Sequence, residues 1–129
     1  MTNLTASPLP GPAASAGLDG RAMLPVTFSP KSRQDLIDIG DYIAKDSRAN
    51  ARRFVAKLIA QSKKIGRSPL GYVSREDLAP GLRMAALDRY VIFFRVLDGE
   101  VRIERVLHSA RNLSVVFGGG DLPPRMRSV

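Results

Sequence analysis

Two strand-like runs joined by an Asp-Gly pair constrain the fold of this chain more than any other feature. Residues 90–97, YVIFFRVL, are apolar on both faces and suit a strand at the centre of a sheet. Residues 100–107, EVRIERVL, alternate, with apolar side chains on one face and charged side chains on the other. The intervening Asp98-Gly99 is typical of a type I′ turn. The sequence therefore predicts a long antiparallel β-hairpin.

Two helices are predicted ahead of this hairpin. Ser29-Pro30 is typical of a helix start, because serine caps free N–H groups and proline lacks the N–H that the first turn leaves unpaired. Apolar residues at helical spacing continue the first helix to about Lys45 and define a second helix over residues 48–65. Since only a short turn separates them, the helices should form an antiparallel hairpin. The apolar stripes comprise Leu36, Ile39, Tyr42 and Ile43 in the first helix, and Ala51, Phe54, Val55, Leu58 and Ile65 in the second.

Two further strands complete the predicted fold. Residues 26–28 form a short strand before the first helix, and residues 81–86 form one before the β-hairpin, after a long loop over 66–81. The predicted class is α+β: an N-terminal short strand, then an antiparallel helical hairpin packed on a twisted antiparallel β-sheet. The face of the sheet away from the helices is expected to stay open to a partner.

Composition divides the chain into one domain and two tails. Residues 24–117 are the predicted folded domain, while residues 1–23 are rich in Ala, Gly, Pro, Ser and Thr and are expected to be a disordered extension. Residues 118–129 are expected to be a flexible C-terminal tail. No apolar run has the length of a membrane span, and no convincing signal peptide is seen. We therefore expect a cytoplasmic protein without a membrane partner.

The charge and cysteine content exclude several classes of site. The formal net charge is +8, which suits an acidic partner, either nucleic acid or an acidic protein segment. The absence of cysteine excludes disulfides, thiolate catalysis and zinc sites that need sulfur. With a single histidine and no DxDxD spacing, we expect neither a metal nor another cofactor.

Four arginines on or after the predicted strands are the candidate binding residues. A guanidinium group binds carboxylate and phosphate alike. Arg83, Arg95 and Arg105 fall on three successive predicted strands, where a suitable register would gather them into a cationic patch. The alternative is that these arginines are solvated at the rim of the domain. One isoleucine lies outside the apolar stripe of the first helix and is expected to be exposed. The predicted partner-binding residues are Ile37, Arg83, Arg95, Arg105 and Arg111.

The single histidine, His108, follows the last predicted strand. A general acid–base role would require a positioned substrate group and an orienting partner. Glu104 is the nearest carboxylate on its face, at about 13 Å along a straight strand, which is too far to orient the ring. The alternative is a corner residue whose ring bonds a backbone carbonyl where the strand ends. Packing roles rather than nucleophilic roles are expected for Tyr42, Tyr72 and Tyr90.

Four stretches of the chain together resemble the ParE toxins of the RelE/ParE superfamily. They are FSPKSRQDLIDIGDYIA, KIGRSPLGYVSRED, GLRMAALDRYVIFFRV and VRIERVLHSARNL, in the same order over nearly the whole predicted domain. The resemblance implies the toxin of a type II toxin–antitoxin pair, with two helices on a twisted antiparallel sheet. Two positions depart from it. Asn112 stands where the family often has aspartate, which removes a salt bridge to an arginine. Phe94 stands where the family often has tyrosine, which removes a hydroxyl group.

The resemblance implies one of two activities. ParE-like members inhibit DNA gyrase, whereas RelE-like members are endoribonucleases that cut messenger RNA on the ribosome. The nuclease alternative would use Arg83, Arg105, His108 and Arg111. Because the predicted strands carry no lysine and no tyrosine follows Tyr90, a non-enzymatic gyrase inhibitor is favoured; a toxin that retains only antitoxin binding is a third possibility. The implied partners are gyrase and a ribbon-helix-helix antitoxin in a hetero-oligomer, with a role in plasmid stabilisation.

Overall fold

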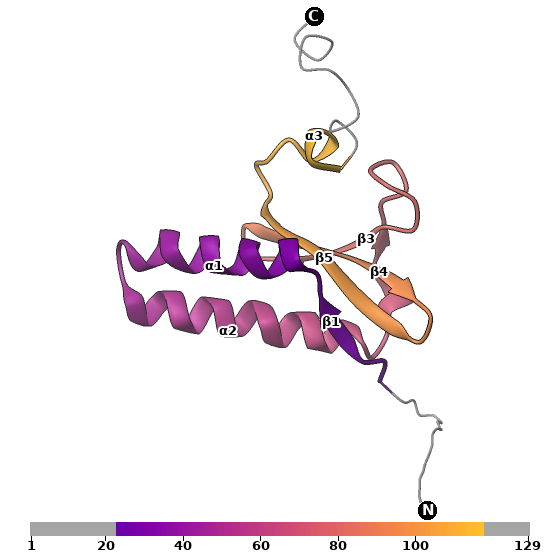
Figure 1. Ribbon diagram of the computed structural model, residues 1–129, viewed down its shortest axis with the longest axis horizontal. Coiled ribbons are helices and arrows are strands. Elements are labelled where there is room, and N and C mark those ends of the chain that lie inside the picture. Colours follow the sequence, from indigo (N-terminus) through magenta and orange to yellow (C-terminus); the bar gives the residue numbers. More distant parts are fainter. Residues whose placement is uncertain (1–22, 118–129) are drawn as a thin grey trace, which may run out of the picture.

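The computed structural model describes residues 23–117 and has helices on both sides of a sheet (Figure 1). The predicted extension before Met23 and the predicted tail therefore lie outside the described residues. Within the described range, no helix combines the length and apolar character that a membrane crossing requires. In chain order the elements are β1 (Val26–Phe28), α1 (Pro30–Ala44), α2 (Arg48–Ile65), the 3₁₀ turn η1 (Pro69–Gly71), β2 (Val73–Ser74), β3 (Arg83–Leu87), β4 (Tyr90–Leu97), β5 (Glu100–His108) and α3 (Leu113–Phe117).

The sheet confirms the α+β class and extends the predicted meander at both edges. The strand order is β1-β5-β4-β3-β2, with β3, β4 and β5 antiparallel as predicted. β1 pairs with β5 in parallel, placing Val26 opposite Val101. The two-residue β2 lies inside the predicted loop and pairs with β3. The sheet is therefore antiparallel except at its β1 edge.

The helix starts form as predicted, but one turn does not. The Ser29 side chain accepts the N–H of Ser32 at the start of α1, and Ser47 caps α2 in the same way. A type I′ turn requires a positive φ at both central residues. Among residues 23–117, Asp88 is the only non-glycine with a positive φ, so Asp98 departs from type I′ and Gly99 alone takes a positive φ, of 69°. The type I′ prediction is wrong, although the hairpin itself is confirmed.

The core has two layers, one on each face of the sheet. α1 and α2 cover one face through Leu58, Ile65 and the other residues of the main cluster. On the outer face, Phe93 packs against Phe117 of α3, with ring centroids 4.7 Å apart. The prediction of an open outer face is therefore wrong where α3 and the loop before β3 cover it. The reason is that β4 is apolar on both faces, so both faces need cover.

Two residues of α1, Tyr42 and Asp35, differ in exposure from what the apolar stripe of this helix predicts, and a third, Ile37, agrees. Tyr42 was predicted to pack in the stripe but is 68% exposed. Ile37 is 55% exposed, as predicted. Asp35, which lies off the apolar stripe, is only 8% exposed. A carboxylate buried to this extent requires hydrogen-bonding partners, because burying an unpaired charge is costly.

Gly66 lies where the end of α2 meets the strand β1. The backbone N–H of Leu24 donates to the carbonyl of Gly66 at 2.9 Å, and a Cβ added at Gly66 would press against the backbone oxygen of Leu24. Because backbone cannot rotate aside, we expect Gly66→Ala to lower the free energy of unfolding by about 2 kcal/mol, measured by chemical denaturation. Gly71→Ala is the matched control, since its Cβ would only meet the Ser68 hydroxyl at 3.4 Å. Equal stability of both variants would contradict this packing.

Candidate functional site

A β-bulge in β5 shapes the candidate site. Arg105 pairs with Phe93 and Arg102 pairs with Arg95, so β5 has two residues between these pairs where β4 has one. Glu104 is the extra residue next to this register shift. Directly opposed residues share a face of the sheet, and alternate residues of β4 share it too. The bulge therefore brings Arg102 and Arg105 to the same outer face, although they are three residues apart.

The first turns of α1 take over from β1 as the partner of β5 beyond the bulge. The N–H of Ser29 donates to the carbonyl of Ile103 at 2.9 Å. The Ser29 hydroxyl donates to the carbonyl of Glu104 at 2.8 Å, and the Asp35 carboxylate accepts the N–H of Val106 at 2.9 Å. These contacts satisfy backbone groups that a neighbouring strand would otherwise bind. They fix the N-terminus of α1 against the bulge.

Arg105 and Asp35 form a bidentate ion pair at this junction. Arg105 Nε lies 2.8 Å from Asp35 Oδ2, and its Nη2 lies 2.9 Å from Oδ1. The side chains are only 20% and 10% exposed. The hydrogen bonds that the guanidinium donates to the Asp35 carboxylate raise the pKa of Arg105, against the opposing effect of burial. Arg105 was predicted to bind a partner, but its guanidinium is already engaged within the domain.

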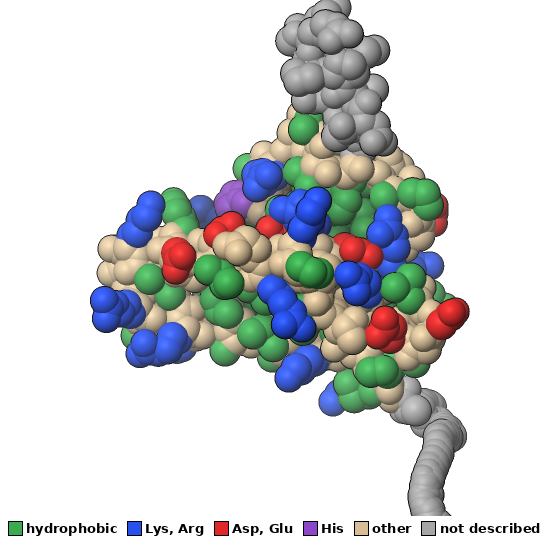
Figure 2. Space-filling view, in the orientation of Figure 1, with side chains coloured by type: hydrophobic (Ala, Val, Ile, Leu, Met, Phe, Trp, Pro, Cys, Tyr) green, Lys and Arg blue, Asp and Glu red, His purple; other side chains and the backbone are tan. Residues whose placement is uncertain are grey.

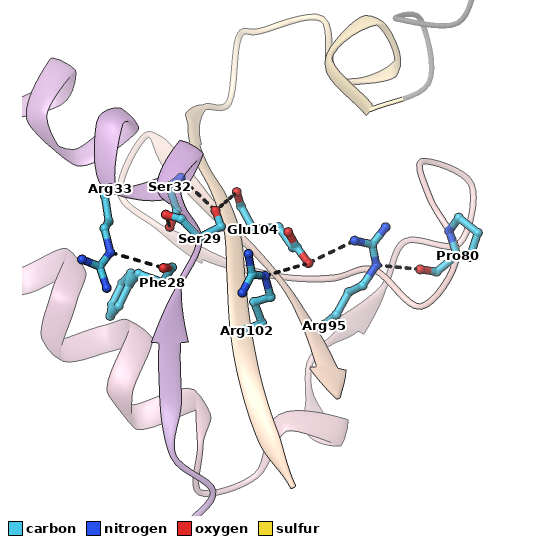
Figure 3. A network of polar contacts seen from close by, with 8 residues as sticks. All are labelled: Phe28, Ser29, Ser32, Arg33, Pro80, Arg95, Arg102 and Glu104. Carbon is cyan, nitrogen blue, oxygen red and sulfur yellow. Dashed lines mark hydrogen bonds and ion pairs between the residues drawn. The ribbon is translucent and has the colours of Figure 1, made fainter. Parts of the chain in front are cut away.

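A second set of charges lies beside this pair on the outer face (Figure 3). Arg95 donates from Nη1 to Glu104 Oε2 at 3.0 Å and from Nε to the carbonyl of Pro80 at 2.9 Å. Arg102 Nε lies 3.8 Å from the same Glu104 oxygen, and its side chain is 37% exposed. Like charges directly opposed across strands repel each other. Glu104, next to both arginines, offsets this repulsion between Arg95 and Arg102.

These charged residues line a hollow of about 490 Å³, here named the basic pocket. It lies between the start of α1, the outer face of β4 and β5, and α3. Figure 2 shows basic side chains spread over this view of the molecule with acidic ones among them. The prediction found Arg95 and Arg105. It missed Arg102, because the bulge does not show in the sequence, and Lys31, because nothing local places the start of α1 beside β5. The lining residues are Ser29, Pro30, Lys31, Arg95, Arg102, Glu104, Arg105, Val116 and Phe117.

The remaining predicted arginines lie elsewhere. Arg83 pairs with Phe94, which belongs to the core under the helices, so Arg83 faces away from the basic pocket. Its Nη1 donates to the carbonyl of Tyr72 at 2.8 Å. Arg111 lines a separate hollow of about 180 Å³ together with His108. The predicted patch of Arg83, Arg95 and Arg105 is therefore wrong, because the register turns Arg83 to the other face.

His108 is a corner residue at the end of β5. Its Nδ1 accepts the backbone N–H of Ala110 at 3.0 Å, so the ring bonds an amide rather than the predicted carbonyl. The ring also meets the Tyr90 ring edge-on, with centroids 5.2 Å apart. Burial, with a contribution from Tyr42, raises the pKa of the Tyr90 hydroxyl, which favours its neutral form. These contacts agree with a packing role for Tyr90.

The two departures from the family pattern have structural counterparts. Asn112 stands at the start of α3, where its side-chain oxygen accepts the Ser114 hydroxyl at 2.9 Å and the N–H of Val115 at 3.4 Å. Arg105 takes its carboxylate partner from α1, at Asp35. Phe94 is fully buried and meets Tyr72 edge-on at 5.7 Å. A hydroxyl at Phe94 would lie in this apolar contact.

A second hollow, here named the hairpin groove, lies between α1 and α2. Its volume is about 560 Å³, and its lining is apolar except for two arginines. Small residues bring the helices close: a Cβ at Gly40 would lie 3.4 Å from the Val55 side chain. Over the described part of the chain, no cluster of three or more His, Asp or Glu residues could hold a metal ion. The groove is lined by Gly40, Ala44, Arg48, Ala51, Arg52, Val55, Ala56 and Ile59.

Comparison with known proteins gives a family match and similar structures. The family model described as "ParE toxin of type II toxin-antitoxin system, parDE" matches residues 26–113. The chromosomal ParDE toxin–antitoxin system of Pseudomonas aeruginosa has a similar chain, with a TM-score of 0.59, 25% identity, and coverage of 67% of this chain and 96% of that one. The RelBE2 toxin–antitoxin complex of Mycobacterium tuberculosis also has a similar chain, with a TM-score of 0.54 and 26% identity. The match covers 72% of this chain and 99% of that one. No curated protein matches.

Proposed function

Because this chain belongs to the ParE toxin family of type II toxin–antitoxin systems, we propose that it inhibits DNA gyrase and that a cognate antitoxin neutralises it. The second candidate activity is messenger RNA cleavage, since one of the similar structures described above is a RelBE complex. The choice between them depends on where the residues of the nuclease alternative lie. Their dispersal is the observation that supports gyrase inhibition.

The residues of the nuclease alternative occupy three separate places. Arg83 bonds the Tyr72 carbonyl on the helix side of the sheet. Arg105 lines the basic pocket and is held by Asp35, while His108 and Arg111 line another hollow, which Asp35 also lines. RNA cleavage through the 2′-hydroxyl requires a base and cations that converge within about 3 Å of the reacting atoms. A protein that inhibits by binding requires only a complementary surface, and a net charge of +8 suits an acidic one.

The hairpin groove supports an antitoxin partner. Both similar structures are described as toxin–antitoxin systems. Ile37 and Ala44 are seven residues apart on α1, so the exposed Ile37 side chain continues the apolar surface of the groove. A groove of this kind accepts the apolar face of an amphipathic helix. We propose that the C-terminal segment of a ribbon-helix-helix antitoxin binds there and forms a hetero-oligomer with the toxin.

Expression without antitoxin tests the proposed activity. We expect DNA synthesis to stop and a DNA-damage response to follow while protein synthesis continues, because gyrase acts on chromosomal DNA. The proposed function would require a cytoplasmic protein, and a toxin–antitoxin pair encoded on a plasmid would stabilise its inheritance. His108→Ala should lose toxicity only as far as it loses folding. Early failure of translation with cut messenger RNA, or a stable His108→Ala variant that binds antitoxin but is harmless, would favour the nuclease. Antitoxin co-expression, which should restore growth, is the control.

A further inference from the structure

One stripe of residues on α1, exposed at Pro30 and Ile37 and half-buried at Ala44, connects the basic pocket with the hairpin groove. Pro30, Ile37 and Ala44 follow one another at seven-residue spacing, which is close to two helical turns. Pro30 lines the basic pocket and Ala44 lines the hairpin groove. Ile37 lies between them and is 55% exposed. The stripe from Pro30 to Ala44 is about 21 Å long at the helical rise, so a single bound segment can reach both hollows.

Two of the four cations in the basic pocket are already engaged. Arg105 forms the bidentate pair with Asp35, and Arg95 is bonded to Glu104 and to the Pro80 carbonyl. Within residues 23–117, the 3.8 Å contact with Glu104 is the only salt bridge of Arg102. Lys31 is exposed and makes no salt bridge with any other residue in 23–117. Lys31 and Arg102 are therefore the cations with binding capacity left.

The pocket is better suited to a peptide than to a nucleic acid. An apolar wall beside the cations is formed by Pro30, Val116 and Phe117. A peptide with an acidic residue next to an apolar one would contact the cations and this wall at the same time. A phosphate backbone is bound by several exposed cations along its length. Here only Lys31 and Arg102 have binding capacity left, which suits one carboxylate rather than a chain of phosphates.

We propose that the basic pocket binds an acidic side chain of the same antitoxin segment that occupies the hairpin groove. Lys31 and Arg102 bind the carboxylate, and the apolar wall takes a neighbouring apolar side chain. This inference rests on the proposed antitoxin partner. The length of the stripe sets the spacing in the antitoxin: about 14 residues between groove anchor and acidic residue if the segment is helical, or about 6 if it is extended.

Binding of the purified toxin to the antitoxin, the product of the adjacent gene, tests the proposal. The dissociation constant is measured at low and high salt. We expect Lys31→Ala with Arg102→Ala to weaken binding about tenfold at low salt and to reduce its salt dependence. Lys64→Ala with Arg67→Ala is the matched control, because these exposed cations line neither hollow. The control should bind within about twofold of the parent. Thermal melting checks that both double variants are folded.

A charge swap provides a second test that does not depend on loss of function. Lys31→Glu with Arg102→Glu should regain affinity when the matching acidic residue of the antitoxin is changed to lysine. Unchanged antitoxin binding by the double alanine variant would overturn the inference, and so would a loss of toxicity with antitoxin binding intact, which would assign the pocket to the target. If the parent toxin does not bind the antitoxin at all, the proposed antitoxin partner fails as well.

Discussion

Asp35→Ala is expected to lower the free energy of unfolding by about 3 kcal/mol, which corresponds to a fall in Tm of more than about 10 °C for a domain of this size. The Asp35 carboxylate binds three donors, namely Nε and Nη2 of Arg105 and the backbone N–H of Val106. Its removal leaves a guanidinium and a backbone amide without a partner in a poorly hydrated junction. Both helix position and strand geometry depend on this one side chain.

Asp38→Ala provides the control for this prediction. Asp38 is an exposed aspartate on the same helix, and its carboxylate accepts only from the Gln34 side chain, at 2.9 Å. We expect its replacement to change stability by less than about 0.5 kcal/mol. Urea denaturation of the two variants at neutral pH gives the comparison. An Asp35→Ala protein as stable as Asp38→Ala would show that the ion pair does not join α1 to β5.

Ala56→Arg is expected to weaken antitoxin binding about 100-fold while leaving Tm unchanged. Ala56 is exposed on α2 and lines the hairpin groove, so its replacement does not disturb the core. The long side chain would fill space that the antitoxin helix needs, and its charge would lie next to Arg52, one turn away. The filled space acts on the complex alone, and the repulsion from Arg52 costs the free toxin only about 0.2–0.5 kcal/mol, since arginine is otherwise a good helix former.

Ala60→Arg separates the groove from the helix as a whole. Ala60 is also exposed on α2 but does not line the groove. The Ala60→Arg variant should bind antitoxin with the same affinity as the parent toxin, measured by isothermal titration calorimetry. If Ala56→Arg and Ala60→Arg bind equally well, the antitoxin does not occupy the hairpin groove.

The predictable part of the fold is the part that local pattern determines. The Ser29 cap and helical spacing identified α1, helical spacing identified α2, and strand propensity together with Asp98-Gly99 identified β4 and β5. The parallel pairing of Val26 with Val101 was not predictable, because the two residues are far apart in sequence and nothing local joins them. α3 was missed because it is a single short turn whose stability comes from packing, such as Phe117 on Phe93.

The candidate site was predicted only in part, and the reason is the bulge. Strict alternation along β5 places Glu104 and Arg105 on opposite faces, whereas the register shift changes that assignment. This is why Arg102 was missed. Asp35 was missed because a charged residue off the apolar stripe suggests exposure, while its partner Arg105 is distant in the chain. Arg83 was misplaced because a strand register cannot be fixed from composition.

Gyrase inhibition is tested most directly with purified components. Relaxed plasmid, gyrase and ATP are incubated with the toxin, and supercoiling is followed by gel electrophoresis; a cell-free translation reaction receives the same toxin concentration. We expect loss of supercoiling, its restoration by the antitoxin, and undiminished translation. Complete supercoiling at toxin concentrations that stop translation and cleave messenger RNA would contradict the proposed function and establish the nuclease in its place.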